Sequence, residues 1–297
     1  MNENRATAGQ VYPVVISASQ KNITSGENKM EYTKTGERTH FNDIVENYEK
    51  IRPEYPDKLF TDIFDFTGAD RKKALEIGAG TGKATTPFLE AGYDVTAIEV
   101  TANMAEFLRE RFKEYKDFNV IVAAFEDVIL NEDGYDLIYV ANAFHWVDAK
   151  IGCPKAYRLL KNGGVFALFR YTGVQAIFEE CFEEIRPVYD KYFRSYYNQS
   201  ERPVRDVYGE PAQILRRFGF NDLRDYGFND ITMKLYETSL MFSADDYIAL
   251  LETYSDHRHL PEENKAVLYK SIKDTILRHG GIYKAEYTFQ LYMGRKL

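Results

Sequence analysis

Residues 75–83 read Leu75-Glu76-Ile77-Gly78-Ala79-Gly80-Thr81-Gly82-Lys83, with three glycines in five positions directly after a short apolar run. The run at 74–77 predicts a buried parallel strand, and residues 84–89 predict the start of a helix. Glycine adopts positive φ and lets a ligand approach the backbone, while the first N–H groups of a helix lack partners. The stretch therefore predicts a ligand-binding turn that attracts polar or negative ligand atoms.

The spacing of the glycines separates two classes of ligand. A dinucleotide fingerprint reads G-x-G-x-x-G, and Lys83 occupies its last position here, which counts against NAD. An acidic residue followed by alternating glycines instead resembles the first motif of class I S-adenosylmethionine (SAM) methyltransferases. This resemblance implies that the methionine part of SAM is bound by Glu76, Gly78, Ala79, Gly80, Thr81 and Gly82.

Composition predicts a soluble cytoplasmic protein. The 297 residues are 44% hydrophobic, which is enough for one large α/β domain with insertions. We find neither an apolar run of 18 residues nor a secretion signal, so we expect no membrane association. The net charge of −8 argues against a nucleic-acid partner. Cys153 and Cys181 lack metal-binding spacing, so we expect reduced thiols and no metal site.

The order of predicted elements gives the fold class. Residues 1–38 are polar and are expected to form a flexible segment, and residues 39–297 are expected to form the domain. Further strands are predicted at 94–98, 119–123, 135–140, 165–170, 231–241 and 283–293. We expect a doubly wound, Rossmann-like α/β fold. The resemblance implies seven strands with the last antiparallel.

The second half of the chain adds helices to this pattern. Helices are predicted at 150–160, 177–197, 211–218, 245–253 and 263–279, and a turn at 161–164. We interpret the regions of about 171–225 and 242–281 as insertions. Together they are expected to form a mainly helical cap over the open ends of the sheet.

Glu99 ends the second predicted strand, 17 residues after Gly82. This is close to the separation at which a βαβ unit places an acid beside a ribose, so we expect Glu99 to accept hydrogen bonds from the two ribose hydroxyls. Glu99-Val100-Thr101-Ala102-Asn103-Met104 also resembles the acid-x-Ser/Thr-x-x-Met pattern of the family. The resemblance implies that Val100 and Met104 flank the adenine, although Met104 also fits a core position.

Residues after the third predicted strand are expected at the adenine edge. The resemblance implies contacts from Phe125 and from a carboxylate, for which Glu126 is our choice. Many family members carry Asp two positions earlier, where this chain has Ala124. Which side chain reaches the exocyclic amine stays open.

The segment 48–56 reads Tyr48-Glu49-Lys50-Ile51-Arg52-Pro53-Glu54-Tyr55-Pro56. It resembles the Y-x-x-x-R-P-x-Y-P entry segment of the trans-aconitate methyltransferase-like group, which lies over the cofactor. We expect the Tyr48 ring to face the sulfonium and the Arg52 guanidinium to bind a carboxylate. Two packing helices are the alternative interpretation.

The fourth predicted strand is followed by Ala141-Asn142-Ala143-Phe144-His145-Trp146. Ligands bind at carboxyl ends of strands in open α/β sheets, and the phrase resembles the A-x-A-F-H-W segment of the same group. We expect Asn142 to bind cofactor, Trp146 to bind substrate, and His145 to take a substrate proton or hold a carboxylate. Packing of Trp146 and a structural His145 are the alternatives. The N/D-P-P-Y/F motif of amino-methylating nucleic-acid enzymes is absent here, and Cys153 lacks the Pro-Cys context of cytosine C5 enzymes.

A last candidate segment is 252–258, which resembles the L-x-T-Y/F-S segment of the same group. Tyr254, Ser255 and His257 are therefore predicted to line the substrate pocket, with an ordinary helix end as the alternative.

Together these features predict a SAM-dependent methyltransferase of a small molecule, acting as a monomer or homodimer, with a carboxylate as a plausible acceptor. A SAM-binding protein without transfer activity and a nicotinamide-dependent dehydrogenase are the competing interpretations.

Overall fold

A computed structural model describes residues 12–13, 51–70, 72–174, 180–199, 215–216, 218–220 and 222–297. Strands and helices alternate through its first half, as the sequence predicts. After α3 (Asp57–Thr67) the elements are β2 (Lys73–Ile77), α4 (Thr85–Glu90), β3 (Asp94–Glu99), α5 (Ala102–Arg111), β4 (Phe118–Val122), β5 (Tyr135–Ala141), α6 (Ala149–Leu159) and β6 (Leu160–Val174). Glycine marks several of these boundaries, as at Gly68, Gly78 and Gly92, so local sequence alone ends these elements.

The strands form one mixed sheet in the order β1-β7-β8-β6-β5-β2-β3-β4. Strands β2 to β6 pair in parallel, and the last strand, β8 (Ile282–Arg295), is antiparallel to β6 and to β7 (Asn229–Ser243). The predicted seven-stranded sheet with an antiparallel last strand is confirmed. The structure adds β1, a two-residue strand (Tyr12–Pro13) paired with the edge of β7.

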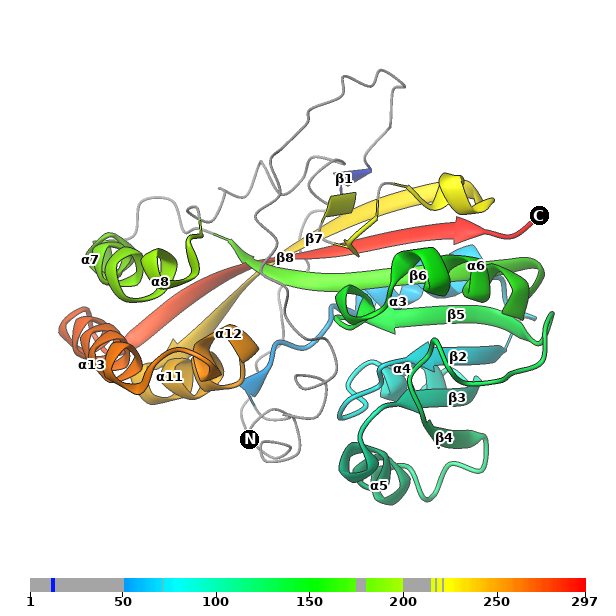
Figure 1. Ribbon diagram of the computed structural model, residues 1–297, viewed down its shortest axis with the longest axis horizontal. Coiled ribbons are helices and arrows are strands. Elements are labelled where there is room, and N and C mark those ends of the chain that lie inside the picture. The colour runs from blue at the N-terminus through cyan, green and yellow to red at the C-terminus, as the bar shows by residue number, and fades with distance from the viewer. Residues whose placement is uncertain are drawn as a thin grey trace.

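Apolar side chains cover both faces of the sheet, as a doubly wound fold requires. One face packs against α3 and α4 through Leu59 and Phe88, and the other packs against α6 through Cys153. Figure 1 shows α6 in front of the sheet and α3 behind it. Cys153 and Cys181 are both buried and form no disulfide. No helix among the described residues has the length and apolarity needed to cross a bilayer.

Strand β6 is longer than predicted at both ends. The predicted turn at 161–164 lies inside it, because the N–H of Gly163 bonds the carbonyl of Lys296 (2.7 Å) and the N–H of Lys296 bonds the carbonyl of Gly164 (2.9 Å). At its other end β6 continues to Val174, opposite Glu286 of β8. These partners are more than 100 residues away in the chain, so local sequence could not reveal them.

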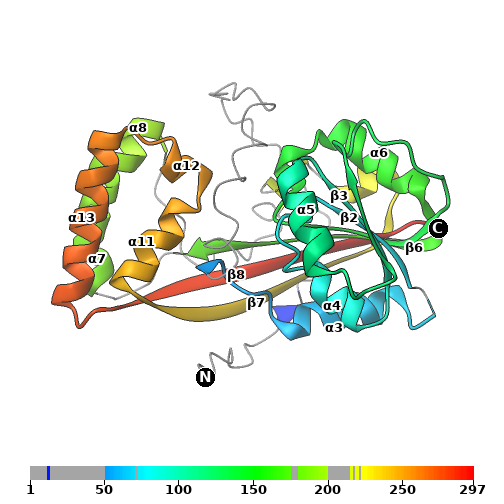
Figure 2. The ribbon, with the colours of Figure 1, turned by 90° about the horizontal axis from the view of Figure 1, so that it is seen from below.

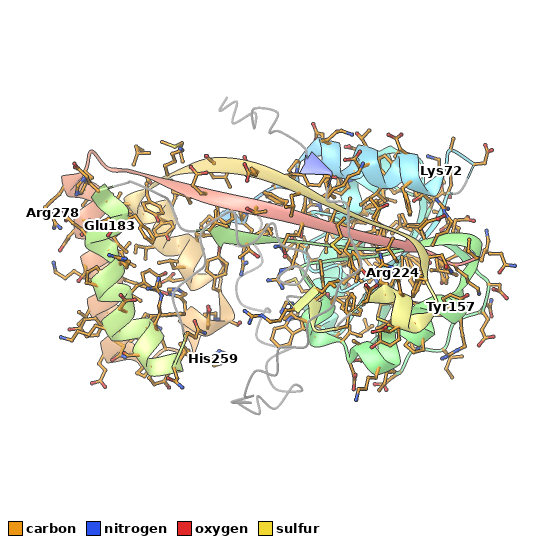
Figure 3. All side chains as sticks on the ribbon, turned by 90° about the horizontal axis from the view of Figure 1, so that it is seen from above. Lys72, Tyr157, Glu183, Arg224, His259 and Arg278 are labelled. Atoms are coloured by element: carbon orange, nitrogen blue, oxygen red, sulfur yellow. The ribbon has the colours of Figure 1, made fainter. Side chains whose placement is uncertain are left out.

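The helices of the second half gather at the far end of β7 and β8 (Figure 2). They are α7 (Glu180–Tyr189), a π-helical segment (Asp190–Arg194), α8 (Ser195–Tyr197), α11 (Ala244–Glu252), α12 (Ser255–Arg258) and α13 (Glu262–Arg278), which we call the cap. Figure 3 labels Glu183, His259 and Arg278 in the cap and Tyr157 and Lys72 in the sheet domain. The predicted helix at 211–218 and the residues before Ile51 fall largely or wholly outside the described residues.

Candidate functional site

A groove opens at the carboxyl ends of β2, β3 and β5, and it consists of two adjoining pockets. Both pockets are lined by Gly78, Gly80, Ala141 and Asn142, which makes them continuous. Of the other residues predicted from sequence, the first pocket contains Glu99, Val100, Met104, Phe125, Glu126 and Trp146. The second contains Arg52, Ala79 and Thr81.

The glycine turn forms the floor of this groove. Gly78, Gly80 and Gly82 all have positive φ, at 72°, 56° and 84°, which explains why glycine is required at this bend. A Cβ atom on Gly78 would lie 2.6 Å from the Cβ of Ala143, whereas one on Gly80 would meet open space. A Cβ on Gly82 would lie 2.5 Å from the Phe112 ring, so Gly82 serves close packing against the end of α5 and does not line the groove.

Glu76 lies beneath the turn and is fully buried. Its Oε2 accepts hydrogen bonds from Thr85 Oγ1 (2.5 Å) and Tyr139 Oη (2.9 Å). Its Oε1 has no hydrogen-bond partner within the part of the chain that the structure describes. Burial, aided by the negative charge of Glu99, raises the pKa of Glu76 to about 7, because a carboxylate loses its hydration in the protein interior.

Glu99 holds the turn against β3. Its Oε2 accepts a hydrogen bond from the N–H of Gly80 (3.0 Å), and its Oε1 accepts from the N–H (3.0 Å) and Oγ1 (3.1 Å) of Thr101. The side chain is nearly buried yet lines the first pocket. A carboxylate offers about four acceptor directions, so Glu99 would release one of these bonds to accept two further hydroxyls.

The first pocket combines apolar walls with the carboxylates of Glu99 and Glu126. Met104 and Phe125 are 2% exposed and both line it. Glu126 also lines this pocket, and its Oε1 accepts from the N–H of Asp148 (3.3 Å). This combination suits a flat apolar ring system that carries hydrogen-bonding groups at its edge.

Asn142 is fixed at the end of β5. Its φ is +52°, its N–H bonds the carbonyl of Phe169 (2.9 Å), and its Oδ1 accepts from the N–H of Tyr171 (3.1 Å). The side chain thereby continues the β5–β6 pairing at the point where both pockets meet.

His145 and Trp146 follow on a short 3-10 helix (Phe144–Trp146), with ring centroids 4.7 Å apart. Trp146 lines the first pocket, and His145 is exposed and absent from both linings. The protein surrounding the accessible ring, together with the positive charges of Arg170 and Arg52, lowers the pKa of His145. A pKa below the ordinary value near 6.5 leaves the imidazole neutral at pH 7.

The second pocket carries positive charge. Arg52 and Lys83 both line it, and Lys83 pairs with the exposed Glu54. Tyr48, predicted to face the sulfonium, lies outside the described residues.

The structure places the three residues predicted to line the substrate pocket, Tyr254, Ser255 and His257, in different surroundings. Tyr254 stacks on the Arg52 guanidinium, whose central carbon is 4.2 Å from the ring centroid. Ser255 begins α12 and lines neither pocket. His257 is 1% exposed, contacts Tyr189 Oη through Nε2 (2.9 Å) and stacks on Phe193. Its position therefore corresponds to packing inside the cap, away from the groove.

Several residues of the groove were not selected from the sequence. They include Ile98, Val147, Tyr55, Lys83 and Tyr171. Lys83 and Tyr55 lie within the two segments that carry the family resemblance, so their proximity to those motifs was an available signal. Tyr171 follows the predicted end of a strand and had no such signal.

Comparison with known proteins gives the class. Residues 75–168 match a protein family described as methyltransferase domain. An uncharacterised methyltransferase of Mycobacterium bovis is 33% identical over 43% of this chain, which spans about half the length of that relative. A malonyl-[acyl-carrier protein] O-methyltransferase of Acetivibrio thermocellus is 24% identical over 70% of this chain and 74% of its own length. A structure described as a type II methyltransferase from Anaeromyxobacter dehalogenans superposes with a TM-score of 0.56 at 21% identity, over 82% of this chain and 97% of that one.

Residues 75–168 and the sheet order thus match a class I SAM-dependent methyltransferase domain, whose cofactor is S-adenosylmethionine. The residues present fit that cofactor. The unpartnered Glu76 Oε1 is a buried acceptor beneath the turn, the space beside Gly80 leaves its backbone accessible, and the groove changes from apolar walls to cationic ones along its length.

Proposed function

We propose that the protein transfers the methyl group of SAM to a small molecule, and that a carboxylate oxygen of this molecule accepts it. The observation that supports SAM as the methyl donor is the polarity of the groove. Its first pocket is mainly apolar and contains two carboxylates, and its second pocket contains Arg52 and Lys83. Adenosine matches the first environment, and the carboxylate of the methionine part matches the second, because a cation stabilises an anion most where water is partly excluded.

This orientation gives each lining residue a role. Val100, Met104 and Phe125 would contact the adenine, with Glu126 at its edge and Glu99 at the ribose. The turn and Glu76 would hold the methionine part, and Asn142 would lie at the junction where the two pockets meet. Trp146 would close the first pocket on the side of the acceptor.

When bound, SAM supplies an electrophilic methyl group on a good leaving group, and the protein needs to supply alignment and exclusion of water. A carboxylate acceptor is already anionic and needs no general base. The lowered pKa of His145 supports an acceptor that needs no base, because an imidazole of low pKa is a weak proton acceptor. The O-methyltransferase activity named for the Acetivibrio relative is consistent with an oxygen acceptor.

Calorimetry with S-adenosylhomocysteine (SAH) tests the cofactor site. We expect wild type to bind SAH and Glu99→Ala to lose at least about 100-fold in affinity, since hydrogen bonds to a charged group contribute about 1.5–3 kcal/mol each. Glu106→Ala, which removes an exposed carboxylate of α5, is the matched control and is expected to bind normally. Retained affinity in Glu99→Ala would contradict the ribose assignment.

Release of SAH from SAM, measured over a panel of carboxylic acids and amines, tests the reaction. Turnover with acids alone supports the proposal, and turnover with amines alone contradicts the carboxylate assignment. Binding of SAM without turnover over the whole panel favours a binding protein, and tighter binding of NADH than of SAM favours a dehydrogenase.

A further inference from the structure

Arg52 lies where the groove, the sheet and the cap meet. Its side chain lines the second pocket together with Gly78 and Asn142. Its Nη1 donates to Tyr171 Oη (3.0 Å) on β6, and its Nη2 donates to the carbonyl of Thr253 (2.6 Å). One side chain thus contacts the cofactor groove and a backbone carbonyl 201 positions later in the chain.

The contacts on the cap side all belong to one short connection. Thr253 follows the last residue of α11, and Tyr254 precedes the first residue of α12. The guanidinium donates to the carbonyl of Thr253 and stacks on the ring of Tyr254, while Tyr254 Oη also lies 3.5 Å from Tyr287 Oη of β8. Arg52 therefore contacts the junction on which the direction of α12 depends.

Tyr171 and Thr253 offer Arg52 neutral oxygen atoms, and Tyr254 offers an aromatic ring. A carboxylate that enters the second pocket would add a charge-assisted hydrogen bond to this guanidinium, which is stronger than these neutral contacts. A guanidinium held on one side by a carboxylate loses conformational freedom, and its hydrogen bond to Thr253 and its stacking on Tyr254 then become more persistent.

We propose that Arg52 is a positioning residue that couples occupancy of the cofactor groove to the position of the cap. This inference rests on the proposed function, because it requires SAM or SAH to place its carboxylate in the second pocket. By reciprocity, the cap contacts also strengthen cofactor binding. Binding of the cofactor therefore stabilises the position of the cap.

Hydrogen–deuterium exchange of the full chain, with and without saturating SAH, tests the coupling. In wild type we expect SAH to slow exchange of residues 244–258 by about tenfold, with α6 as an internal reference. Arg52→Lys and Arg52→Ala, each saturated according to its own measured SAH affinity, are expected to lose this cofactor-dependent protection. A residue with a purely structural role would change exchange equally with and without SAH.

Three further variants separate the contact of Arg52 with the cap from its role in the second pocket. Tyr254→Leu removes the stacking ring and is expected to lose the protection, whereas Tyr254→Phe keeps the ring and retains it. Lys83→Met removes the other cation of the second pocket and is expected to weaken SAH binding but to keep cap protection at saturation.

The outcomes are distinguishable. If wild type fails to bind SAH, the proposed function falls and the inference falls with it. If wild type binds SAH and residues 244–258 exchange equally with and without it, the coupling alone is overturned. Full protection in saturated Arg52→Ala would overturn the role of Arg52 in the same way.

Discussion

Tyr139 Oη donates a hydrogen bond of 2.9 Å to Glu76 Oε2 beneath the glycine turn. This bond and the one from Thr85 stabilise the ionised carboxylate, but burial outweighs them and raises the pKa of Glu76 to about 7. The turn therefore rests on a carboxyl group that titrates near neutral pH.

Stability without ligand is expected to fall as this group ionises. The pKa of Glu76 is about 4.5 when the chain is unfolded and about 7 in the folded protein, so the folded state binds the proton more tightly. Its contribution is fully present below pH 4.5 and is lost as the pH rises to about 7, by up to about 3 kcal/mol. Urea unfolding of wild type and Glu76→Gln at pH 5 and pH 8 measures this.

Comparison of wild type with Glu76→Gln separates the effect of Glu76 from that of the other groups that titrate between the two pH values. Glu76→Gln is expected to narrow the difference in unfolding free energy between the two pH values relative to wild type. Equal differences in both proteins would show that Glu76 does not titrate in this range.

The glycine turn is predicted to tolerate no side chain at Gly78. Alanine there must adopt a φ of +72° and place its Cβ 2.6 Å from that of Ala143. Gly92 has a similar φ of +77° but open space around its Cβ position, so Gly92→Ala measures the backbone strain alone, about 1–2 kcal/mol. We expect Gly78→Ala to cost about 1–3 kcal/mol more than this control and to abolish SAH binding, as measured by urea unfolding and calorimetry. A similar cost in both variants, with SAH binding kept, would contradict the close approach at Gly78.

The agreement between sequence and structure is greatest where local rules act. The strand ends at Ile77, Glu99 and Ala141 lie within one residue of their predicted positions, because each buried apolar run stops at a polar or glycine-rich segment. These ends fix the groove, and most of its cofactor residues follow from them.

What sequence could not predict depends on contacts between distant segments. Val174 pairs with Glu286, and this pairing carries β6 beyond its local signal and places the cap at the far end of the long strands. Arg52 was predicted to bind a carboxylate, but its bonds to Tyr171 and Thr253 join segments 119 and 201 positions apart. His257 resembled a pocket residue in sequence, and only the fold shows its contact with Tyr189.

His145 is expected to remain neutral across physiological pH. The surrounding protein and the charges of Arg170 and Arg52 lower its pKa, because both disfavour the imidazolium form. Its Cε1 proton signal, assigned from its loss in His145→Gln, should not shift between pH 6.5 and 8. Arg170→Gln removes one of the charges and is expected to raise the pKa of His145, whereas Lys150→Gln, an exposed cation of α6, should leave it unchanged. A titration centred near pH 7 in wild type would contradict this.

A pair of threonines across β6 and β8 gives a further test of stability. Thr172 and Thr288 are opposite each other in the register, and neither hydroxyl has a hydrogen-bond partner in the described ranges. Thr288 is 1% exposed, so its hydroxyl is desolvated without compensation. Because valine has nearly the same shape, Thr288→Val is expected to raise the free energy of unfolding by about 1 kcal/mol.

Thr253→Val is the matched control for this substitution. Thr253 is equally buried, but its hydroxyl donates to the carbonyl of Leu250 at 2.6 Å. The same chemical change there removes a bond that is made, and we expect it to lower the free energy of unfolding by about 1 kcal/mol. Urea unfolding of both variants therefore yields shifts of opposite sign if the hydroxyl of Thr288 is unsatisfied. A loss of stability in Thr288→Val as large as that in Thr253→Val would show that its hydroxyl makes a bond in solution.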